Sequence, residues 1–183
     1  MSTGAGGQVE IRAVRPEEYE RVGELTVAGY AALPVDHLWG GYDDEIRAVA
    51  ERLETTEIFV ALIDGEVVGA VTYVSDPDSP WLEFSDPGEA QIRLLAVDPS
   101  VQRRGIGELL VDRCIERARE QGLTIVLHTT EHLTAAQRLY SRKGFVRRPE
   151  RDVHDFEADH DMTFMAFTLD PGSEGRGGCG GFD

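Results

Sequence analysis

The chain of 183 residues lacks any apolar stretch long enough to cross a membrane as a helix, which takes about 20 residues. Its longest apolar runs, such as Ile58 to Ile63, fall far short of that length. Residues 1–7 contain neither a basic start nor an apolar centre, so we expect no signal peptide. These absences predict a cytoplasmic protein without a membrane partner.

Cysteine and basic residues are also scarce. Cys114 lies on a helical pattern and Cys179 in a glycine-rich tail, which predicts one packed thiol and one exposed, free thiol. Lys and Arg number 18 against 34 Asp and Glu, a formal net charge of −16 at pH 7. Nucleic-acid binding needs cationic surface, so we expect no nucleic-acid partner. The acidity is compatible with a cationic small substrate and equally with solubility alone.

What the sequence does contain is the periodicity of one α/β domain over residues 9–170. Alternating or β-rich runs predict strands, and apolar residues at helical spacing predict helices. The expected strands are 9–14, 58–63, 67–74 (after a hairpin turn at Asp64-Gly65), 91–97, 123–129 and 162–169, with a brief one from 145; the expected helices start at 16, span 43–54, run from 106 to about 121, and span 134–143. Hairpin strands followed by a β-α-β unit predict a mixed sheet with helices on both faces. We expect residues 1–8 to be flexible and the glycine-rich residues 171–183 to be disordered.

The most informative segment is Gln102-Arg103-Arg104-Gly105-Ile106-Gly107, which joins the strand at 91–97 to a helix. Its two glycines let the backbone approach a ligand closely. The helix adds unpaired N–H groups and the positive end of its dipole. A strand–loop–helix junction of this kind binds phosphates, so the segment predicts a pyrophosphate site. The helix is expected to bury a stripe formed by Ile106, Leu109, Leu110, Cys114 and Ala118.

Two common nucleotide-binding motifs do not fit this segment. A Walker-type loop has lysine and then Ser or Thr after its second glycine, whereas Glu108 and Leu109 follow Gly107. A dinucleotide fingerprint has a third Gly or Ala where Leu110 stands, and its strand ends directly before the first glycine. Here the last strand residue, Val97, lies several residues earlier. An ATP, GTP or dinucleotide site is therefore disfavoured.

A second block downstream narrows the ligand further. Ala136 to Tyr140 has the pattern Ala-x-x-Leu-Tyr, and Gly144-Phe145 follows it. This block and the earlier Gln-x-x-Gly-x-Gly pattern, which follows a strand ending in Ala-Val-Asp-Pro, together resemble the GNAT N-acetyltransferase superfamily. The two blocks occur in that family's order and spacing, and the likeness is clearest from Gln91 to Val146.

The resemblance implies an N-acetyltransferase that moves an acetyl group directly from acetyl-CoA, its cosubstrate, to a primary amine. It implies a mostly antiparallel sheet in which the strand at 91–97 splays from its parallel neighbour at 123–129. Pantetheine would lie in that gap, and the N–H groups from 103 to 107 would hold the pyrophosphate. Arg103 and Arg104 could add charge-assisted contacts or could face solvent. The implied cofactor-binding residues are Leu95, Ala96, Val97, Gln102, Arg103, Arg104, Gly105, Ile106 and Gly107, with no metal.

The same resemblance implies that Tyr140 is the general acid that protonates the leaving thiolate. General acid catalysis typically contributes about 10²- to 10⁴-fold in rate. The alternative role for this ring is packing against the pantetheine arm. A backbone N–H of Leu95 or Val97 could polarise the thioester carbonyl.

The general base is less clear, because many relatives carry a glutamate where Gln91 stands. Glu89 lies two residues earlier on the same strand face if the strand extends that far, and it is the favoured catalytic base. Glu83, Glu131 and a water chain are alternatives. Many relatives also have a cofactor-contacting asparagine where Leu133 stands. The departures at Gln91 and Leu133 keep open a non-catalytic acyl-CoA-binding or regulatory module.

Two further clusters bear on the acceptor. The segment from His154 to Asp161 has no metal-ligand spacing, so we expect a solvated acidic loop, which could also border the amine site. The aromatic residues between the first two helices either pack at an edge or cover the acceptor: Tyr30, His37, Trp39 and Tyr42. The acceptor itself, a small amine or a peptide amine, is not identified, and the resemblance allows a homodimer.

Overall fold

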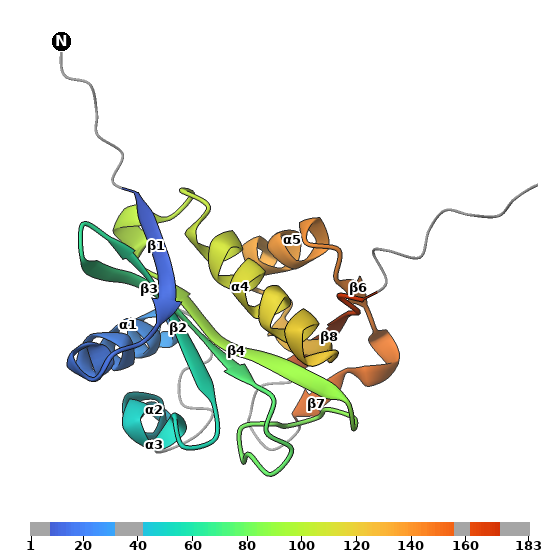
Figure 1. Ribbon diagram of the computed structural model, residues 1–183. Coiled ribbons are helices and arrows are strands. Elements are labelled where there is room, and N and C mark those ends of the chain that lie inside the picture. Colours follow the sequence, from blue (N-terminus) through green and yellow to red (C-terminus); the bar gives the residue numbers. More distant parts are fainter. Residues whose placement is uncertain (1–7, 32–41, 156–161, 173–183) are drawn as a thin grey trace, which may run out of the picture.

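A computed structural model describes residues 8–31, 42–155 and 162–172 of the chain. Its centre is an eight-stranded sheet with the order β1-β2-β3-β4-β5-β8-β6, in which β7 also pairs with β8 (Figure 1). The strands are β1 (Val9–Ala13), β2 (Glu57–Ile63), β3 (Glu66–Val74), β4 (Glu89–Val97), β5 (Thr124–Thr130), β6 (Val146–Arg147), β7 (Val153–Asp155) and β8 (Met162–Leu169). β4 and β5 are parallel, and the other described pairs are antiparallel. The predicted mixed, mostly antiparallel sheet is confirmed.

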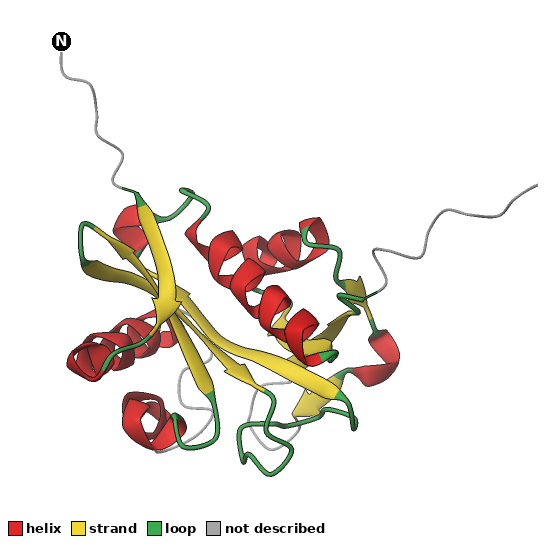
Figure 2. Ribbon diagram, viewed as in Figure 1, coloured by secondary structure: helices red, strands yellow, loops and turns green. Residues whose placement is uncertain are grey.

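Helices cover both faces of the sheet (Figure 2). On one face lie α1 (Tyr19–Ala31), α2 (Tyr42–Arg47) and α3 (Val49–Arg52); on the other lie α4 (Ile106–Gln121) and α5 (Thr134–Arg142). Short 3-10 turns precede α1, follow β4 and precede β7: η1 (Pro16–Glu18), η2 (Pro99–Val101) and η3 (Pro149–Arg151). Apolar side chains fill the layer on each side of the sheet. Within the described residues, no helix is both long and apolar enough to span a bilayer.

Three local predictions are corrected by the structure. The helix expected over 43–54 is broken at Ala48, whose ψ of 57° is not helical, and so becomes α2 and α3. The expected acidic loop begins as strand β7, because its first residues pair with β8; residues 156–161 lie outside the described part. Leu109 is 40% exposed, because the buried stripe of α4 drifts about 40° every four residues and takes in Val111 instead. Cys114 is buried, as predicted.

The two ends of the chain also fall largely outside the description. Residues 1–7 and 173–183, which contain nearly all of the predicted flexible start and the predicted disordered tail, are not among the described residues. The free thiol expected at Cys179 lies there too.

The strands β4 and β5 separate along their length. They pair only near their N-terminal ends, where Glu89 lies opposite Thr124 and Gln91 opposite Val126. A β-bulge follows in β4: Leu94 and Leu95 both face Val71 of β3, and Leu94 has a φ of 53°. A bulge bends its strand, and β4 leaves β5 over this half. The splay implied by the family resemblance is therefore present.

Candidate active site

The predicted phosphate segment forms the turn between η2 and α4. Arg103 and Gly105 both have left-handed backbones, with φ of 64° and 77°, and Gly105 is the N-cap of α4. Left-handed residues close together turn successive N–H groups toward one concavity, which suits an anion. The first N–H groups of α4 add to it because they have no partner within the helix. Residues 102–105 are exposed, so an anion can reach them.

Asp98 fixes the start of this turn. Its carboxylate accepts hydrogen bonds from Ser100 N at 2.9 Å and Ser100 Oγ at 2.7 Å. It also forms an ion pair with Arg21 of α1 at 2.7 Å. These bonds, led by that from the Ser100 hydroxyl, hold the pKa of Asp98 below its ordinary value. The Asp-Pro of the motif thus ties the turn to a helix on the opposite face of the sheet.

Gly107 lies where α4 approaches both α5 and the end of β4. A Cβ at this position would lie 3.3 Å from Leu139 Cδ1 and 3.8 Å from Val97 Cγ2. A larger side chain would therefore enter the junction beside the open half of β4.

The open half of β4 presents an unpaired backbone edge toward β5. The side chains of Leu95 and Val97 pack on the α4 side of the sheet, and Ala96 packs on the α1 side. Beyond Gln91, β4 has no ladder partner on β5. Such an edge can receive an extended chain that carries amide groups, as a strand would be received. The pantetheine arm of CoA has that character, so these residues fit the group implied by the resemblance.

Tyr140 comes from α5 and is only 6% exposed. Its ring centroid lies 5.7 Å from that of Phe145 and 6.3 Å from that of Phe167. The chain reverses at Gly144, which has a φ of 86°, and this reversal brings Phe145 back onto the tyrosine. Burial raises the pKa of the Tyr140 phenol, so the hydroxyl keeps its proton throughout the neutral range.

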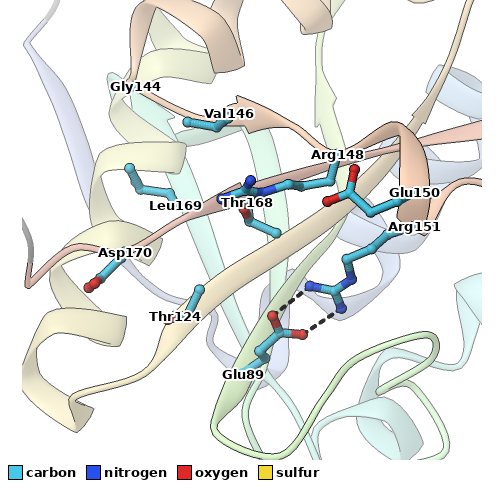
Figure 3. A pocket seen from close by; sticks show the side chains of 10 residues that line it. All are labelled: Glu89, Thr124, Gly144, Val146, Arg148, Glu150, Arg151, Thr168, Leu169 and Asp170. Carbon is cyan, nitrogen blue, oxygen red and sulfur yellow. Dashed lines mark hydrogen bonds and ion pairs between the residues drawn. The ribbon is translucent and has the colours of Figure 1, made fainter.

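Glu89 does begin β4, so the strand extends as far as the prediction required. Its two carboxylate oxygens each accept a hydrogen bond of 2.7 Å from the guanidinium of Arg151 (Figure 3). One of them also accepts the backbone N–H of Asp86 at 2.8 Å. Burial opposes the charge, but these bonds hold the pKa of Glu89 below its ordinary value. The pair lines a cavity of about 430 Å³ between the starts of β4 and β5, the end of β8, and η3. The structure does not bring Glu89 into contact with Tyr140.

The other carboxylates considered from the sequence lie elsewhere. Glu83 is half exposed and pairs with Arg93 of β4 at 2.9 Å. The backbone N–H of Glu83 donates to Gln91 Oε1 at 3.0 Å. The buried side chain of Gln91, which stands where many relatives carry a glutamate, is therefore already hydrogen-bonded within the protein. Glu131 lies at the end of β5, is exposed, and approaches His132 at 3.8 Å. Of the three, Glu83 is the one in contact with a side chain of central β4.

Leu133 leaves the start of α5 without a side-chain cap. Gln137 instead joins this helix to the end of β5, since its Nε2 donates to the carbonyls of Thr130 at 2.9 Å and Glu131 at 3.3 Å. Hydrogen bonds within the protein therefore hold the start of α5, where many relatives have an asparagine that contacts the cofactor.

Several polar side chains on the α1–α3 side of the sheet were not predicted from the sequence. Arg93 could have been recognised as unusual, because it interrupts an apolar strand. The sequence gives no sign that Arg52, at the end of α3, is buried, because an arginine on a short helix is usually exposed. Tyr30 and Tyr42 pack in this region with Trp81, whereas His37 and Trp39 lie outside the described residues. Within the described ranges, no three His, Cys, Asp or Glu side chains gather as a metal site requires.

These features define a protein with a CoA-type phosphate turn beside a splayed strand pair. A sequence model of the Acetyltransferase (GNAT) family matches residues 19–145. This range covers more than half of the chain, and the protein therefore belongs to the GNAT acetyltransferase family.

Individual proteins agree with this assignment. Mycothiol acetyltransferase of Geodermatophilus obscurus is 27% identical over 147 residues, which cover 76% of this chain and 45% of that protein. The chain spans less than half the length of the mycothiol acetyltransferases it matches. An N-acetyltransferase of Staphylococcus aureus Mu50 has a TM-score of 0.67 at 21% identity, covering 90% of this chain and 99% of its own. The structure of yncA from Salmonella typhimurium, solved with its cofactor acetyl-CoA, has a TM-score of 0.67 at 19% identity, covering 89% and 94%. At these identities the solved structures show a shared fold.

Proposed function

We propose that this protein transfers an acetyl group from acetyl-CoA to a primary amine. The proposal rests on one observation: a turn that offers backbone N–H groups, Arg103 to Gly107, follows the strand whose open half leaves a gap beside β5. A ligand with a diphosphate and an extended, amide-bearing arm suits this pair of features. Membership of an acetyltransferase family supports acetyl-CoA as that ligand.

We assign the pyrophosphate to the turn from Gln102 to Gly107 and the pantetheine arm to the backbone of Leu95, Ala96 and Val97. When bound, acetyl-CoA supplies a thioester as the acetyl donor. We assign the polarisation of the thioester carbonyl to a backbone N–H of Leu95 or Val97, since a fixed dipole beside developing charge needs no reorganisation. Arg103 and Arg104 add positive charge beside the phosphates, a contact expected to be weak because both residues are exposed.

Tyr140 is proposed as the general acid that returns a proton to the CoA sulfur. The buried phenol keeps its proton at neutral pH, and its ring is held by Phe145 and Phe167. A held donor that need not be ordered during the reaction is what general acid catalysis requires.

For the general base, the structure favours a different carboxylate from the one preferred on sequence grounds. Glu89 would have to give up hydrogen bonds to Arg151 in order to accept a proton, and its pKa is lowered. Glu83 also pairs with an arginine, Arg93 at 2.9 Å, but its side chain is half exposed, whereas that of Glu89 is 10% exposed and is held by two bonds. We therefore propose Glu83 as the base and retain Glu89 as the alternative. Glu83→Gln should lower kcat and remove the acidic limb of the pH profile, whereas Glu89→Gln should do neither.

One observation favours a second candidate function. Gln91 cannot act as a base, and its side-chain oxygen is already bound to the backbone of Glu83. A non-catalytic acyl-CoA-binding or regulatory module would tolerate that. The test is release of free CoA thiol from acetyl-CoA in the presence of a broad panel of amines. Tight binding of acetyl-CoA, measured by thermal stabilisation, with no thiol release on any amine would favour the module. A cytoplasmic location and a homodimer remain predictions from the sequence.

A further inference from the structure

Two arginine side chains, Arg52 and Arg93, contact the same tryptophan ring on the α1–α3 side of the sheet. The guanidinium carbons of Arg52 and Arg93 lie 5.7 Å and 5.4 Å from the ring centroid of Trp81. Arg52 Nη1 donates to Thr72 Oγ1 at 2.9 Å, and Thr72 lies directly opposite Arg93 in the β3–β4 pair. We call these three side chains, Arg52, Arg93 and Trp81, the arginine–tryptophan cluster.

Arg52 is a buried charge without an anionic partner. Its side chain belongs to a residue that is 2% exposed, and its Nε and Nη2 have no hydrogen-bond partner. Within the described residues no carboxylate forms an ion pair with it. Burial lowers the pKa of Arg52 to about 10, so the group still carries its charge at neutral pH. A buried, unpaired charge with unmet donors is strongly unfavourable unless something else supplies the anion.

The absence of a carboxylate here is notable in an acid-rich chain. Acidic residues outnumber basic ones 34 to 18, and other arginines of the sheet region form ion pairs with carboxylates. Arg147 pairs with Asp152 at 2.5 Å and Arg117 with Glu57 at 2.8 Å. Arg93 does contact a carboxylate, that of the half-exposed Glu83, and donates to the Trp81 carbonyl at 2.9 Å. The cluster as a whole therefore carries more buried positive charge than its protein neighbours neutralise.

The cluster also lies next to the proposed reaction centre. Arg93 directly precedes Leu94, the bulge residue, and because of the bulge both side chains lie on the α1–α3 side. The next residue, Leu95, packs on the other side, where Tyr140 belongs to the same apolar layer. A group bound at Arg52 and Arg93 would thus lie beside the part of β4 to which the thioester is assigned.

We propose that the acceptor is a small amine that bears a carboxylate, that is, a free amino acid or a close analogue, with the carboxylate bound by Arg52 and Arg93. This rests on the proposed acetyl transfer. Glu83 is paired with Arg93. With the substrate carboxylate at the arginines, Glu83 would lie near the ammonium group and receive its proton. In the transfer, Glu83 takes one proton from the ammonium group, and the freed amine nitrogen forms the new bond to the acetyl carbon. The carbon–sulfur bond breaks as Tyr140 protonates the leaving sulfur, the second proton lost by the nitrogen restores the Tyr140 phenol, and Glu83 releases its proton to solvent. The cationic amines suggested by the overall net charge, such as polyamines, are poor matches for this local charge.

The first experiment compares matched acceptors. Thiol release is measured with a panel of L-amino acids, their amides and corresponding amino alcohols, and with polyamines. Charge-assisted bonds to the carboxylate should raise kcat/KM for the acids over the amides on the order of 10- to 100-fold. Equal or better turnover of amides, alcohols or polyamines would overturn the carboxylate proposal while leaving acetyl transfer intact. Absence of release with every amine would instead overturn acetyl transfer itself.

The second experiment removes the buried charge. Arg52→Met keeps an unbranched, flexible side chain without the guanidinium, and it should raise KM for the amino acid about 10- to 100-fold with little change in kcat. KM for the matching amide should not change, and Tm should not fall, because a buried unpaired charge has been removed. Arg52→Lys should recover part of the affinity. A fall in Tm together with equal effects on acid and amide would make Arg52 a structural residue and sink the proposal.

Arg113→Met is the matched control. Arg113 lies on α4, on the opposite side of the sheet, with its guanidinium carbon 4.8 Å from the ring centroid of Phe59. The Arg113→Met variant therefore loses the same kind of arginine–aromatic contact as Arg52→Met. KM for amino acids should stay at the level of the unaltered protein.

Discussion

The two ends of β4 differ in how their polar groups are satisfied. At the closed end, Glu89 to Gln91 pair with β5, Glu89 is bound by Arg151, and Gln91 is bound to the backbone of Glu83. At the open end, from Leu94 to Val97, the backbone edge has no partner on β5, and the adjacent Arg52 has unmet donors. Buried polar groups that bond within the protein stabilise the fold. Those left unbonded are the ones a ligand can satisfy, so substitutions at the two ends should give different phenotypes.

The largest effect is expected from Tyr140→Phe, because Tyr140 shares an apolar layer with Leu95 and Val97 of the open end. The ring and its packing remain, but the proton donor is lost, so kcat should fall about 10²- to 10⁴-fold with acetyl-CoA affinity retained. Steady-state kinetics over a range of pH measures this. Tyr73→Phe is the control, because Tyr73 is equally buried but its hydroxyl bonds to Gln121 at 2.6 Å. Full turnover of Tyr140→Phe would leave this residue with a packing role only.

The next effect concerns the turn before α4. In Gly105→Val a branched side chain is forced into a φ of 77°, which costs roughly 1–2 kcal/mol or deforms the turn. The Kd for acetyl-CoA, measured by calorimetry, should rise at least about 10-fold as the N–H groups lose their alignment.

Gly88→Val provides the matched control for that substitution. Gly88 has a φ of 87°, precedes the closed end of β4, and, like Gly105, has no atom within 4 Å of an added Cβ. It should lose similar stability and keep its acetyl-CoA affinity. Equal loss of affinity in both variants would mean that Gly105 acts through stability alone.

A smaller effect is expected at the closed end, from Glu89→Gln. This change removes the negative charge that Arg151 contacts with two hydrogen bonds, and the free energy of unfolding should drop by about 1–3 kcal/mol. Denaturant unfolding reports the loss, and kcat should be unaltered. If kcat falls and the pH profile shifts while stability is kept, Glu89 is the base after all, and the distinction between the two ends fails.

The smallest effect is a change in acid sensitivity. The pKa of Glu89 is lower in the folded protein than its ordinary value of about 4.5. Its stabilising contribution is therefore complete above that ordinary value and is lost as the pH falls through the folded pKa. Tm should stay level from about pH 7 to 5 and decline below that, and the decline should be shallower in Glu89→Gln. An identical slope in both proteins would show that other carboxylates control acid unfolding.

Local patterns made much of this architecture predictable. The turn at Gly105, the tyrosine at 140 and nearly all strands follow from short-range spacing, because each depends on residues close in sequence. The ion pair of Glu89 with Arg151 joins residues that are 62 apart, so no local pattern could reveal it. The bulge at Leu94 places a leucine at a positive φ, for which leucine gives no signal. The burial of Arg52 depends on how α3 meets β3, which only the tertiary structure fixes.

The bulge in β4 has a consequence for the register of the whole strand. Ala96 packs against α1 so closely that a Cβ on Gly29 would lie 3.2 Å from the Ala96 Cβ. If the second half of β4 slid by one residue along β3, Leu95 or Val97 would replace Ala96 at this contact, where there is room only for a methyl group. The bulge therefore cannot be removed by a shift in register. The close contact of Gly29 with Ala96 fixes the register of the second half of β4, and with it which backbone amides point into the gap.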